Sequence, residues 1–307
     1  MAGCNSASSS QYSPSTSGSA SHAAHLHGIR PNCCITYGRT LFITDYAANA
    51  VQLFDFPSNT YIGHLSPPPE GFSAPAGACT DDKGTVYITN SHNESIDEYA
   101  HDGKYLKTLH DAGWYPIACA FDRSSGKLAV SNISTPSDGQ GSVSIYGDAK
   151  GRPSVHIDPE IQQMLYLGYQ GNTGVLYVDG QGAGRGFEYA SLVDGRFTNI
   201  KIRGANIEFP GTVAYSEVTR SMNVGDQIAK VLYQVSPTGH VTGTTQLIQS
   251  GDIIQGTIKD DRFIGPDGGS EGVETYRYPQ GGNAESTIYG YFTEPFGSAI
   301  SQTVLSK

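Results

Sequence analysis

Short hydrophobic runs, each ended by a small or polar turn, recur along most of the chain. The clearest run returns after about 44 residues, and it ends at Asp, Asn or a small residue. Its six copies are TLFITDY from Thr40, TVYITNS from Thr85, KLAVSNI from Lys127, VLYVDGQ from Val175, SMNVGDQ from Ser221 and DRFIGPD from Asp261. Runs of this length and composition predict strands, and their regular spacing predicts a repeat architecture.

Three further strand-like segments accompany each run. A shorter one that often starts at Pro or Gly precedes it, one with an aromatic residue near its end follows, and a fourth comes after a turn rich in Gly or Asn. Six units of four antiparallel strands, each too small to fold alone, predict an all-β, six-bladed β-propeller.

The two ends of the repeat region compete for one position. RPNCCIT, residues 30–36, can supply the inner strand of the first blade, but EPFGSAIS, residues 294–301, also resembles an inner strand. Either the C-terminal segment closes the ring in place of RPNCCIT, or it packs outside, or the ring has seven blades with one degenerate.

Composition supports the all-β class and restricts the partners. Charged residues make up 16% of the chain, and 38 Gly, 16 Pro and 19 Tyr favour strands and tight turns over long helices. The net charge of −10, without a basic patch, argues against nucleic acid as a partner. No apolar run approaches the ~20 residues of a transmembrane helix.

From residue 31 to about residue 300, the repeats resemble those of the NHL and gluconolactonase-like propeller superfamily. The shared features are the second strand of each unit and the turn with Gly and an aromatic residue. Enzymes, binding modules and scaffolds all use these repeats, so the resemblance implies the fold more strongly than an activity.

The N-terminal segment resembles that of a bacterial lipoprotein. Ala2 and Gly3 precede Cys4 as in a lipobox, whose Cys becomes linked to diacylglycerol, and a Ser-, Gly- and Ala-rich tether follows. We therefore predict a lipobox remnant and flexible tether over residues 1–28 and a single propeller domain over 29–307. The resemblance implies an exported protein of the cell envelope, in the periplasm or outer membrane, that reaches the membrane only through this anchor. The alternative is a fortuitous Cys in a trimmed tail.

Four cysteines remain, and all fall on inner strands of the first three blades. They are Cys33, Cys34, Cys79 and Cys119. In an exported protein they form a possible disulfide pool, in which Cys34 with Cys79 or Cys79 with Cys119 would join neighbouring blades. They are equally well interpreted as small buried hydrophobic residues.

Oxygen-bearing side chains end the second strand of every unit. They are Asp45, Asn90, Asn132, Asp179, Asp226 and Asp267. Rotational symmetry places them in a ring on one face of the disc, the upper face, where such a ring could take Ca²⁺ or another divalent cation. The competing interpretation is that each residue caps the turn that follows it.

Longer loops on the upper face supply candidate ligand-binding residues. They are Tyr46, His92, Glu94, Trp114, Tyr115 and Arg185. Aromatic rings, a guanidinium and acceptors around a shallow depression suit a protein, glycan or small-molecule ligand.

Two classes of function follow, and the first is preferred because no catalytic motif is present. The first is a lipid-anchored, monomeric binding or scaffold module that uses its upper face. The second is a metal-dependent hydrolase or lyase resembling gluconolactonase-type propellers, with Asn90 and Asn132 at the positions of two metal-binding amides. Blade one, however, has Asp45 and Tyr46 where that family has a Glu, and this departure weakens the enzyme hypothesis.

Overall fold

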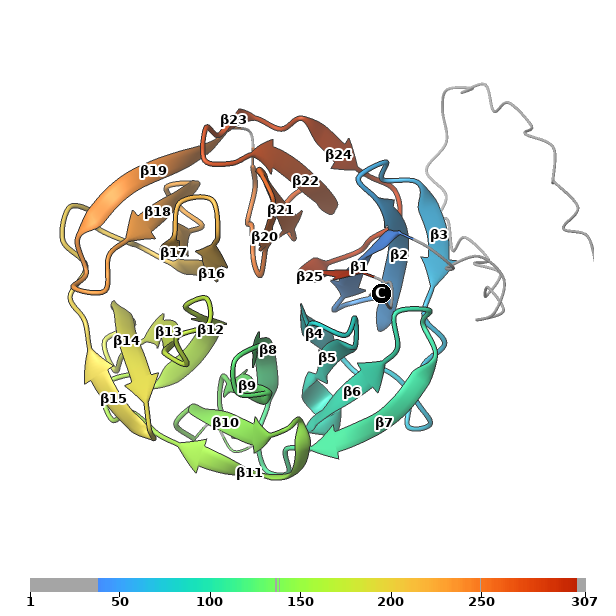
Figure 1. Ribbon diagram of the computed structural model, residues 1–307, viewed down its shortest axis with the longest axis horizontal. Coiled ribbons are helices and arrows are strands. Elements are labelled where there is room, and N and C mark those ends of the chain that lie inside the picture. Colours follow the sequence, from blue (N-terminus) through green and yellow to red (C-terminus); the bar gives the residue numbers. More distant parts are fainter. Residues whose placement is uncertain (1–37, 136, 138, 249, 303–307) are drawn as a thin grey trace, which may run out of the picture.

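Six small antiparallel sheets surround a central channel in the computed structural model, which describes residues 38–302 except 136, 138 and 249 (Figure 1). The prediction of a six-bladed β-propeller is confirmed. From the channel outward, blade 1 contains β25 (Pro295–Gln302), β1 (Arg39–Asp45), β2 (Ala50–Phe56) and β3 (Tyr61–His64), and blade 2 contains β4 (Pro75–Thr80), β5 (Val86–Asn90), β6 (Ser95–Tyr99) and β7 (Tyr105–His110). Blade 3 contains β8 (Pro116–Asp122), β9 (Lys127–Asn132), β10 (Ser142–Gly147) and β11 (Lys150–His156), and blade 4 contains β12 (Gln163–Tyr169), β13 (Leu176–Gln181), β14 (Phe187–Val193) and β15 (Arg196–Asn199).

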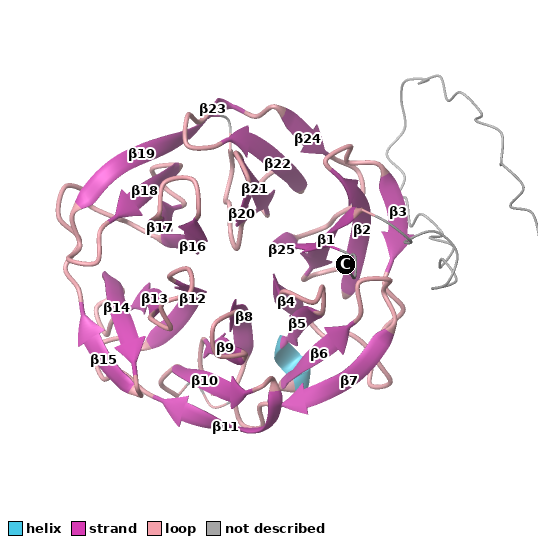
Figure 2. Ribbon diagram, in the orientation of Figure 1, coloured by secondary structure: helices cyan, strands magenta, loops and turns pink. Residues whose placement is uncertain are grey.

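Blades 5 and 6 follow the same plan with one addition. Blade 5 contains β16 (Pro210–Ser216), β17 (Ser221–Asp226), β18 (Val231–Val235) and β19 (Val241–Ile248), and blade 6 contains β20 (Thr257–Lys259), β21 (Arg262–Asp267), β22 (Gly272–Arg277) and β24 (Ser286–Ile288). A short strand, β23 (Gly282–Asn283), adds to the outer edge of blade 5 in parallel with β19. The helical content of the described residues is one 3₁₀ turn, η1 (Ser91–Asn93) (Figure 2). Within these same residues, no helix is long and apolar enough to cross a membrane.

The C-terminal strand closes the ring. β25 pairs with β1 in an antiparallel register that places Leu41 opposite Ile300 and Phe42 opposite Ala299. Residues 294–301 therefore complete blade 1 rather than begin a seventh blade, while RPNCCIT lies outside the described residues. Closure between the two ends of the chain protects a sheet edge that would otherwise be unpaired.

Buried tyrosines on the third strands of blades 2, 3 and 6 connect each of these blades to the one before it. They donate their hydroxyl hydrogen to a carbonyl oxygen of the preceding blade or crossover: Tyr99 to Ser66 (3.1 Å), Tyr146 to His110 (3.1 Å) and Tyr276 to Ile248 (3.4 Å). Their rings are fully buried between the blades. The recurring aromatic residue in the sequence thus provides both apolar packing and a polar link between blades.

Hydroxyl side chains near the ends of the second strands hold the inner strands together. Thr44 of β1 accepts a hydrogen bond from the backbone N–H of Gly297 in its own blade (2.8 Å) and donates to the carbonyl of Ala76 in blade 2. Ser131 of β9 donates to the carbonyl of Leu165 in blade 4 (2.6 Å). Such bonds satisfy backbone groups at the bulges of the inner strands and fix the spacing of the blades around the channel.

Candidate functional site

The disc has two chemically different faces. The upper face holds the starts of the inner strands, the turns after the second strands and the crossovers between blades. The lower face holds the ends of the inner strands and the short hairpin turns. The sequence predicted the candidate metal- and ligand-binding residues on the upper face.

The six residues of the predicted ring are buried at the upper ends of the second strands. Their exposed fractions are 0% for Asp45, Asn132, Asp179 and Asp267, 1% for Asn90 and 2% for Asp226. The Asp226 carboxylate accepts hydrogen bonds from the backbone N–H groups of Ile228 (3.0 Å) and Ala229 (3.2 Å) in the following turn and of Glu208 (3.0 Å) in the incoming crossover. It therefore fastens a turn to a crossover, as a cap does.

Two other carboxylates of the ring make the same kind of connection. Asp45 accepts from the N–H groups of Ala48 (3.1 Å), Thr293 (2.8 Å) and Glu294 (2.9 Å), and Asp267 from those of Gly251, Asp252 (2.7 Å), Gly269 (2.9 Å) and Ser270 (3.1 Å). Each of these two carboxylates already accepts hydrogen bonds from at least three backbone N–H groups. The capping interpretation therefore accounts for Asp45, Asp226 and Asp267 through contacts that a cation would have to displace.

The remaining members of the ring have local partners as well. Asn90 accepts from the N–H of Ser73 (2.7 Å) and donates to Asp97 (2.9 Å), and Asn132 donates to the hydroxyls of Ser142 (3.1 Å) and Ser144 (3.0 Å). Asp179 accepts one hydrogen bond, from the N–H of Tyr166 (2.9 Å), and burial raises its pKa well above the usual range. Within the described part of the chain, no three His, Cys, Asp or Glu side chains form a group able to hold a metal. A cation on this face stays a prediction.

Three of the predicted ligand-binding residues meet on the upper face. The hydroxyl oxygen of Tyr46 lies 3.3 Å from Nε2 of His92, and the rings of His92 and Tyr115 are 5.6 Å apart between centroids. Phe296, at the start of the closing strand, stacks on Tyr46 with centroids 5.7 Å apart. We call Tyr46, His92, Tyr115 and Phe296 the upper aromatic group. His92 is exposed and the other three are half-buried.

The core beneath the upper aromatic group supports it and affects its chemistry. Tyr46 and Phe296 pack against the buried cluster that includes Ala76 and Ile117 of the inner strands. Burial raises the pKa of Tyr46, and the nearby charge of Glu294 raises it further. A phenol with a raised pKa keeps its proton at neutral pH, so Tyr46 acts as a hydrogen-bond donor rather than as a general base.

The other predicted ligand-binding residues, Glu94, Trp114 and Arg185, are not part of the upper aromatic group. Glu94 accepts a hydrogen bond from the N–H of Gly113 (2.6 Å) and so braces the crossover that carries Trp114 and Tyr115. Trp114 lines a separate hollow of about 850 Å³ at the outer edge of blades 2 and 3, together with Lys107 and Arg152. Arg185 is exposed in a tight turn of blade 4 with a φ of 59°. The sequence thus predicts the face of these residues but not their distance from the channel.

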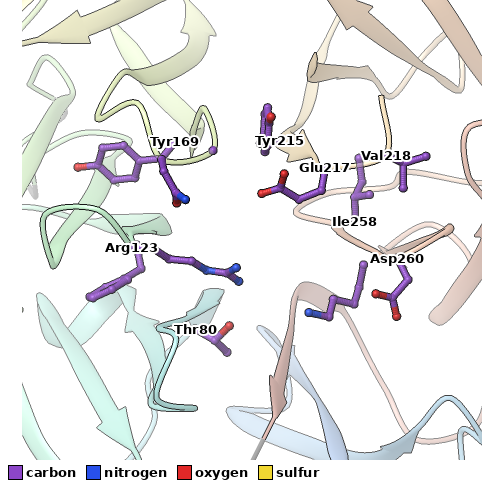
Figure 3. Close-up of a pocket in the computed structure, with 12 residues that line it drawn as sticks. Thr80, Arg123, Tyr169, Tyr215, Glu217, Val218, Ile258 and Asp260 are labelled. Carbon is purple, nitrogen blue, oxygen red and sulfur yellow. The ribbon is translucent and has the colours of Figure 1, made fainter. Parts of the chain in front are cut away.

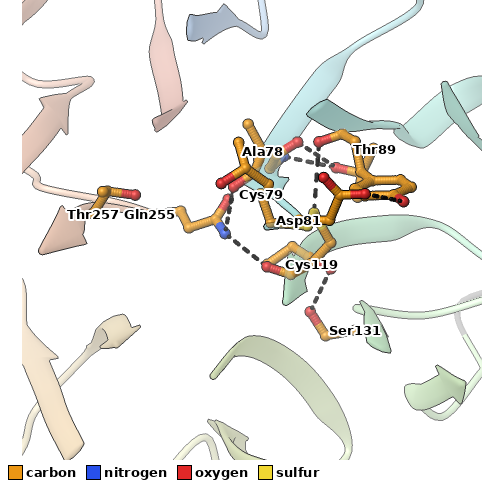
Figure 4. The surroundings of a disulfide bond; sticks show 12 residues. Ala78, Cys79, Asp81, Thr89, Cys119, Ser131, Gln255 and Thr257 are labelled. Atoms are coloured by element: carbon orange, nitrogen blue, oxygen red, sulfur yellow. Dashed lines mark hydrogen bonds between the residues drawn. A yellow bond between two sulfur atoms is a disulfide. The ribbon is translucent and has the colours of Figure 1, made fainter. Parts of the chain in front are cut away.

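A disulfide joins Cys79 of β4 to Cys119 of β8, with Cα atoms 5.7 Å apart (Figure 4). This is one of the two pairings that sequence reasoning left open. Gln255 reaches the same place from blade 6, where its amide accepts from the N–H of Ala78 (2.9 Å) and donates to the carbonyl of Cys119 (3.4 Å). The bond and the amide together tie three blades across the channel. Cys4, Cys33 and Cys34 lie outside the described residues.

A hollow that sequence reasoning missed lies on the lower face. A cavity of about 410 Å³ opens where five inner strands end, and Arg123, Tyr215, Glu217 and Lys259 are among its lining residues (Figure 3). The signal in the sequence was weak, because charged residues directly after short strands are also ordinary turn residues.

The sequence matches no protein family and no curated protein among those compared. Solved structures match the fold. A chain in the crystal structure of a nidogen/laminin complex is 14% identical, with a TM-score of 0.71 over 87% of this chain and 99% of that one. A calcium-binding protein, regucalcin from Agrobacterium tumefaciens strain C58, is 16% identical, with a TM-score of 0.55 over 73% of this chain and 77% of that one. At these identities the likeness shows the six-bladed β-propeller fold alone.

Proposed function

We propose that this propeller is a binding module that holds a protein partner on its upper face. The upper aromatic group carries the proposal, because it collects four rings from three separate segments of blades 1 and 2 and from the crossover into blade 3. Aromatic residues are enriched in the cores of protein interfaces, where large rigid side chains bury area at low entropic cost. The similar chain from the nidogen/laminin complex is consistent with such a role for the fold, since it was solved within a protein complex.

A photocrosslinking amino acid tests this proposal. p-Benzoylphenylalanine replaces Tyr115 in the upper aromatic group or, as the control, Val193, whose side chain is 43% exposed at the lower-face turn between β14 and β15. In native cells the probe at residue 115 should give one discrete adduct with an envelope protein, and the probe at residue 193 should not. Equal labelling from both positions, or no adduct from residue 115, would count against the upper face.

The proposal includes export and a lipid anchor at Cys4. The Cys79–Cys119 disulfide supports an oxidising compartment, since such bonds persist mainly in exported proteins. With a bacterial signal sequence placed before Met1, we expect the protein to partition into the detergent phase and Cys4→Ser to move it to the aqueous phase. Equal partitioning of the two proteins would contradict lipidation, and intact mass measurement of the detergent fraction identifies the acyl groups directly.

A divalent cation, with hydrolase activity, is a second candidate because one similar structure is a calcium-binding protein. The ring supplies the predicted carboxylate ligands, of which Asp45, Asp226 and Asp267 already accept backbone hydrogen bonds. If Asp226 binds a cation, the loss of stability on removing its carboxylate should depend on calcium.

A further inference from the structure

The lower mouth of the channel is a formed cavity with a floor. The ends of five inner strands form its wall, and the lining residues on these strands are Thr80, Phe121, Tyr169, Tyr215 and Ile258. A second space of about 210 Å³ continues inward to the Cys79–Cys119 disulfide and Gln255. The cavity of about 410 Å³ falls within the range that small-molecule sites occupy.

Two cations line this cavity without a direct ion pair of their own among the described residues. Arg123 follows β8, Lys259 ends β20, and neither side chain forms an ion pair or hydrogen bond with another residue that the structure describes. Asp260, which also lines the cavity, is instead engaged by Arg39 from blade 1. Burial lowers the pKa of Lys259, the charge of Asp260 raises it, and the charges of Arg123 and Arg39 lower it further. The two cations thus face one space in which an anionic group can contact both.

One acceptor stands opposite Arg123. Glu217 follows β16, and its carboxylate and the guanidinium of Arg123 point into the cavity from opposite sides (Figure 3). Among the described residues, Glu217 also lacks an ion pair and a side-chain hydrogen bond. A ligand between them can therefore give a negative group to the cations and a hydrogen-bond donor to Glu217.

Aromatic rings form part of the wall between the charged groups. Tyr215 is held close to the turn after β12, where a Cβ atom added at Gly171 would lie 3.2 Å from its ring. The positive φ of Gly171, 51°, belongs to the same turn. Tyr215 and Phe121 offer apolar surface to the body of a ligand, as aromatic side chains do in sugar and small-molecule sites.

We propose that the lower-face cavity binds a compact organic acid whose carboxylate lies at Arg123 and Lys259 and whose hydroxyl or ammonium groups lie at Glu217. Acidic sugars and amino acids share this chemistry. The site is on the opposite face from the upper aromatic group, so it does not depend on the function proposed above.

Titration calorimetry of the full chain at low ionic strength and pH 7 tests the site with three probes. D-Glucuronate carries a carboxylate and hydroxyls, L-serine a carboxylate and an ammonium group, and D-glucose hydroxyls alone. We expect glucuronate or serine to bind at least tenfold more tightly than glucose, because a charge-assisted hydrogen bond adds about this factor. The acid that binds more tightly shows whether the ligand belongs to the acidic sugars or to the amino acids.

Variants of the charged residues locate the binding. Arg123→Gln and Lys259→Met should each weaken binding of the tighter acid about tenfold. Glu217→Gln should weaken the binding of serine more than that of glucuronate, because the ammonium group of serine loses a charged contact. Arg196→Gln, an exposed residue of β15 away from the cavity, is the matched control and should bind as the wild type does. The proposal is overturned if neither acid binds, if glucose binds as tightly as the acids, or if the cation variants match the control. Unchanged circular dichroism in each variant excludes loss of folding as the cause.

Discussion

Replacing Asp226 with alanine should lower the free energy of unfolding by about 3 kcal/mol, because a buried carboxylate is removed and its backbone donors lose their acceptor. The carboxylate is 2% exposed and receives N–H groups from both the crossover and the turn that it joins. A water molecule can replace some of these bonds, since Ile228 in the same turn is 57% exposed. The loss is therefore smaller than the sum over all the donors.

Urea unfolding followed by circular dichroism measures this loss, and it is run in chelator and in calcium. Asp226→Asn keeps one acceptor oxygen and should lose only about 1 kcal/mol, while Glu208→Ala, whose backbone rather than side chain contacts Asp226, is the matched control. If Asp226 is a cap, the loss is equal in both buffers. A loss that occurs only in calcium would instead identify Asp226 as a metal ligand and favour the hydrolase.

Removing the Cys79–Cys119 disulfide should cost about 2–4 kcal/mol, the range expected for a bond that closes a loop of this size. The two cysteines are 40 residues apart in sequence and join the inner strands of blades 2 and 3. The bond restricts the unfolded chain across one whole repeat, while Gln255 still connects the same strands in the folded state. We therefore expect a less stable protein that keeps its fold.

The double variant Cys79→Ser/Cys119→Ser, compared with the wild type before and after reduction, gives the size of this effect. Reduction should lower the stability of the wild type to that of the variant and leave the variant unchanged. Peptide mapping of the unreduced protein should recover the 79–119 crosslink. Two alkylatable thiols at these positions in protein purified without reductant would contradict the bond.

The fold was predictable because the information is local and repeated. The segment TLFITDY contains, within seven residues, the buried face of β1, the hydroxyl of Thr44 that bridges two blades and the carboxylate of Asp45 that caps the next turn. The same positions recur in TVYITNS, where Thr89 accepts from the N–H of Gly77 in its own blade and Asn90 accepts from that of Ser73 in the crossover. Ring closure was not predictable in this way, since the choice between two inner strands depends on a pairing between opposite ends of the chain.

The candidate sites were predictable only where symmetry decides the outcome. Tyr46 and His92 follow second strands of neighbouring blades, so the repeat itself brings them close together. Phe296 joins them only because β25 closes the ring, which was one of the alternatives that the sequence left open. The lower-face cavity escaped prediction for a related reason. Its charged residues come from three different hairpin turns, and each turn alone resembles ordinary turn chemistry.

The dissociation constant of the envelope protein captured from residue 115 is the measurement that decides the proposed function. Tyr46→Ala/Tyr115→Ala should weaken its binding about a hundredfold, as the loss of two aromatic hot-spot residues typically does. Arg123→Gln, on the lower face, should leave the constant within about twofold of the wild-type value. Unchanged affinity in the double variant, or a large loss in Arg123→Gln, would contradict binding through the upper face.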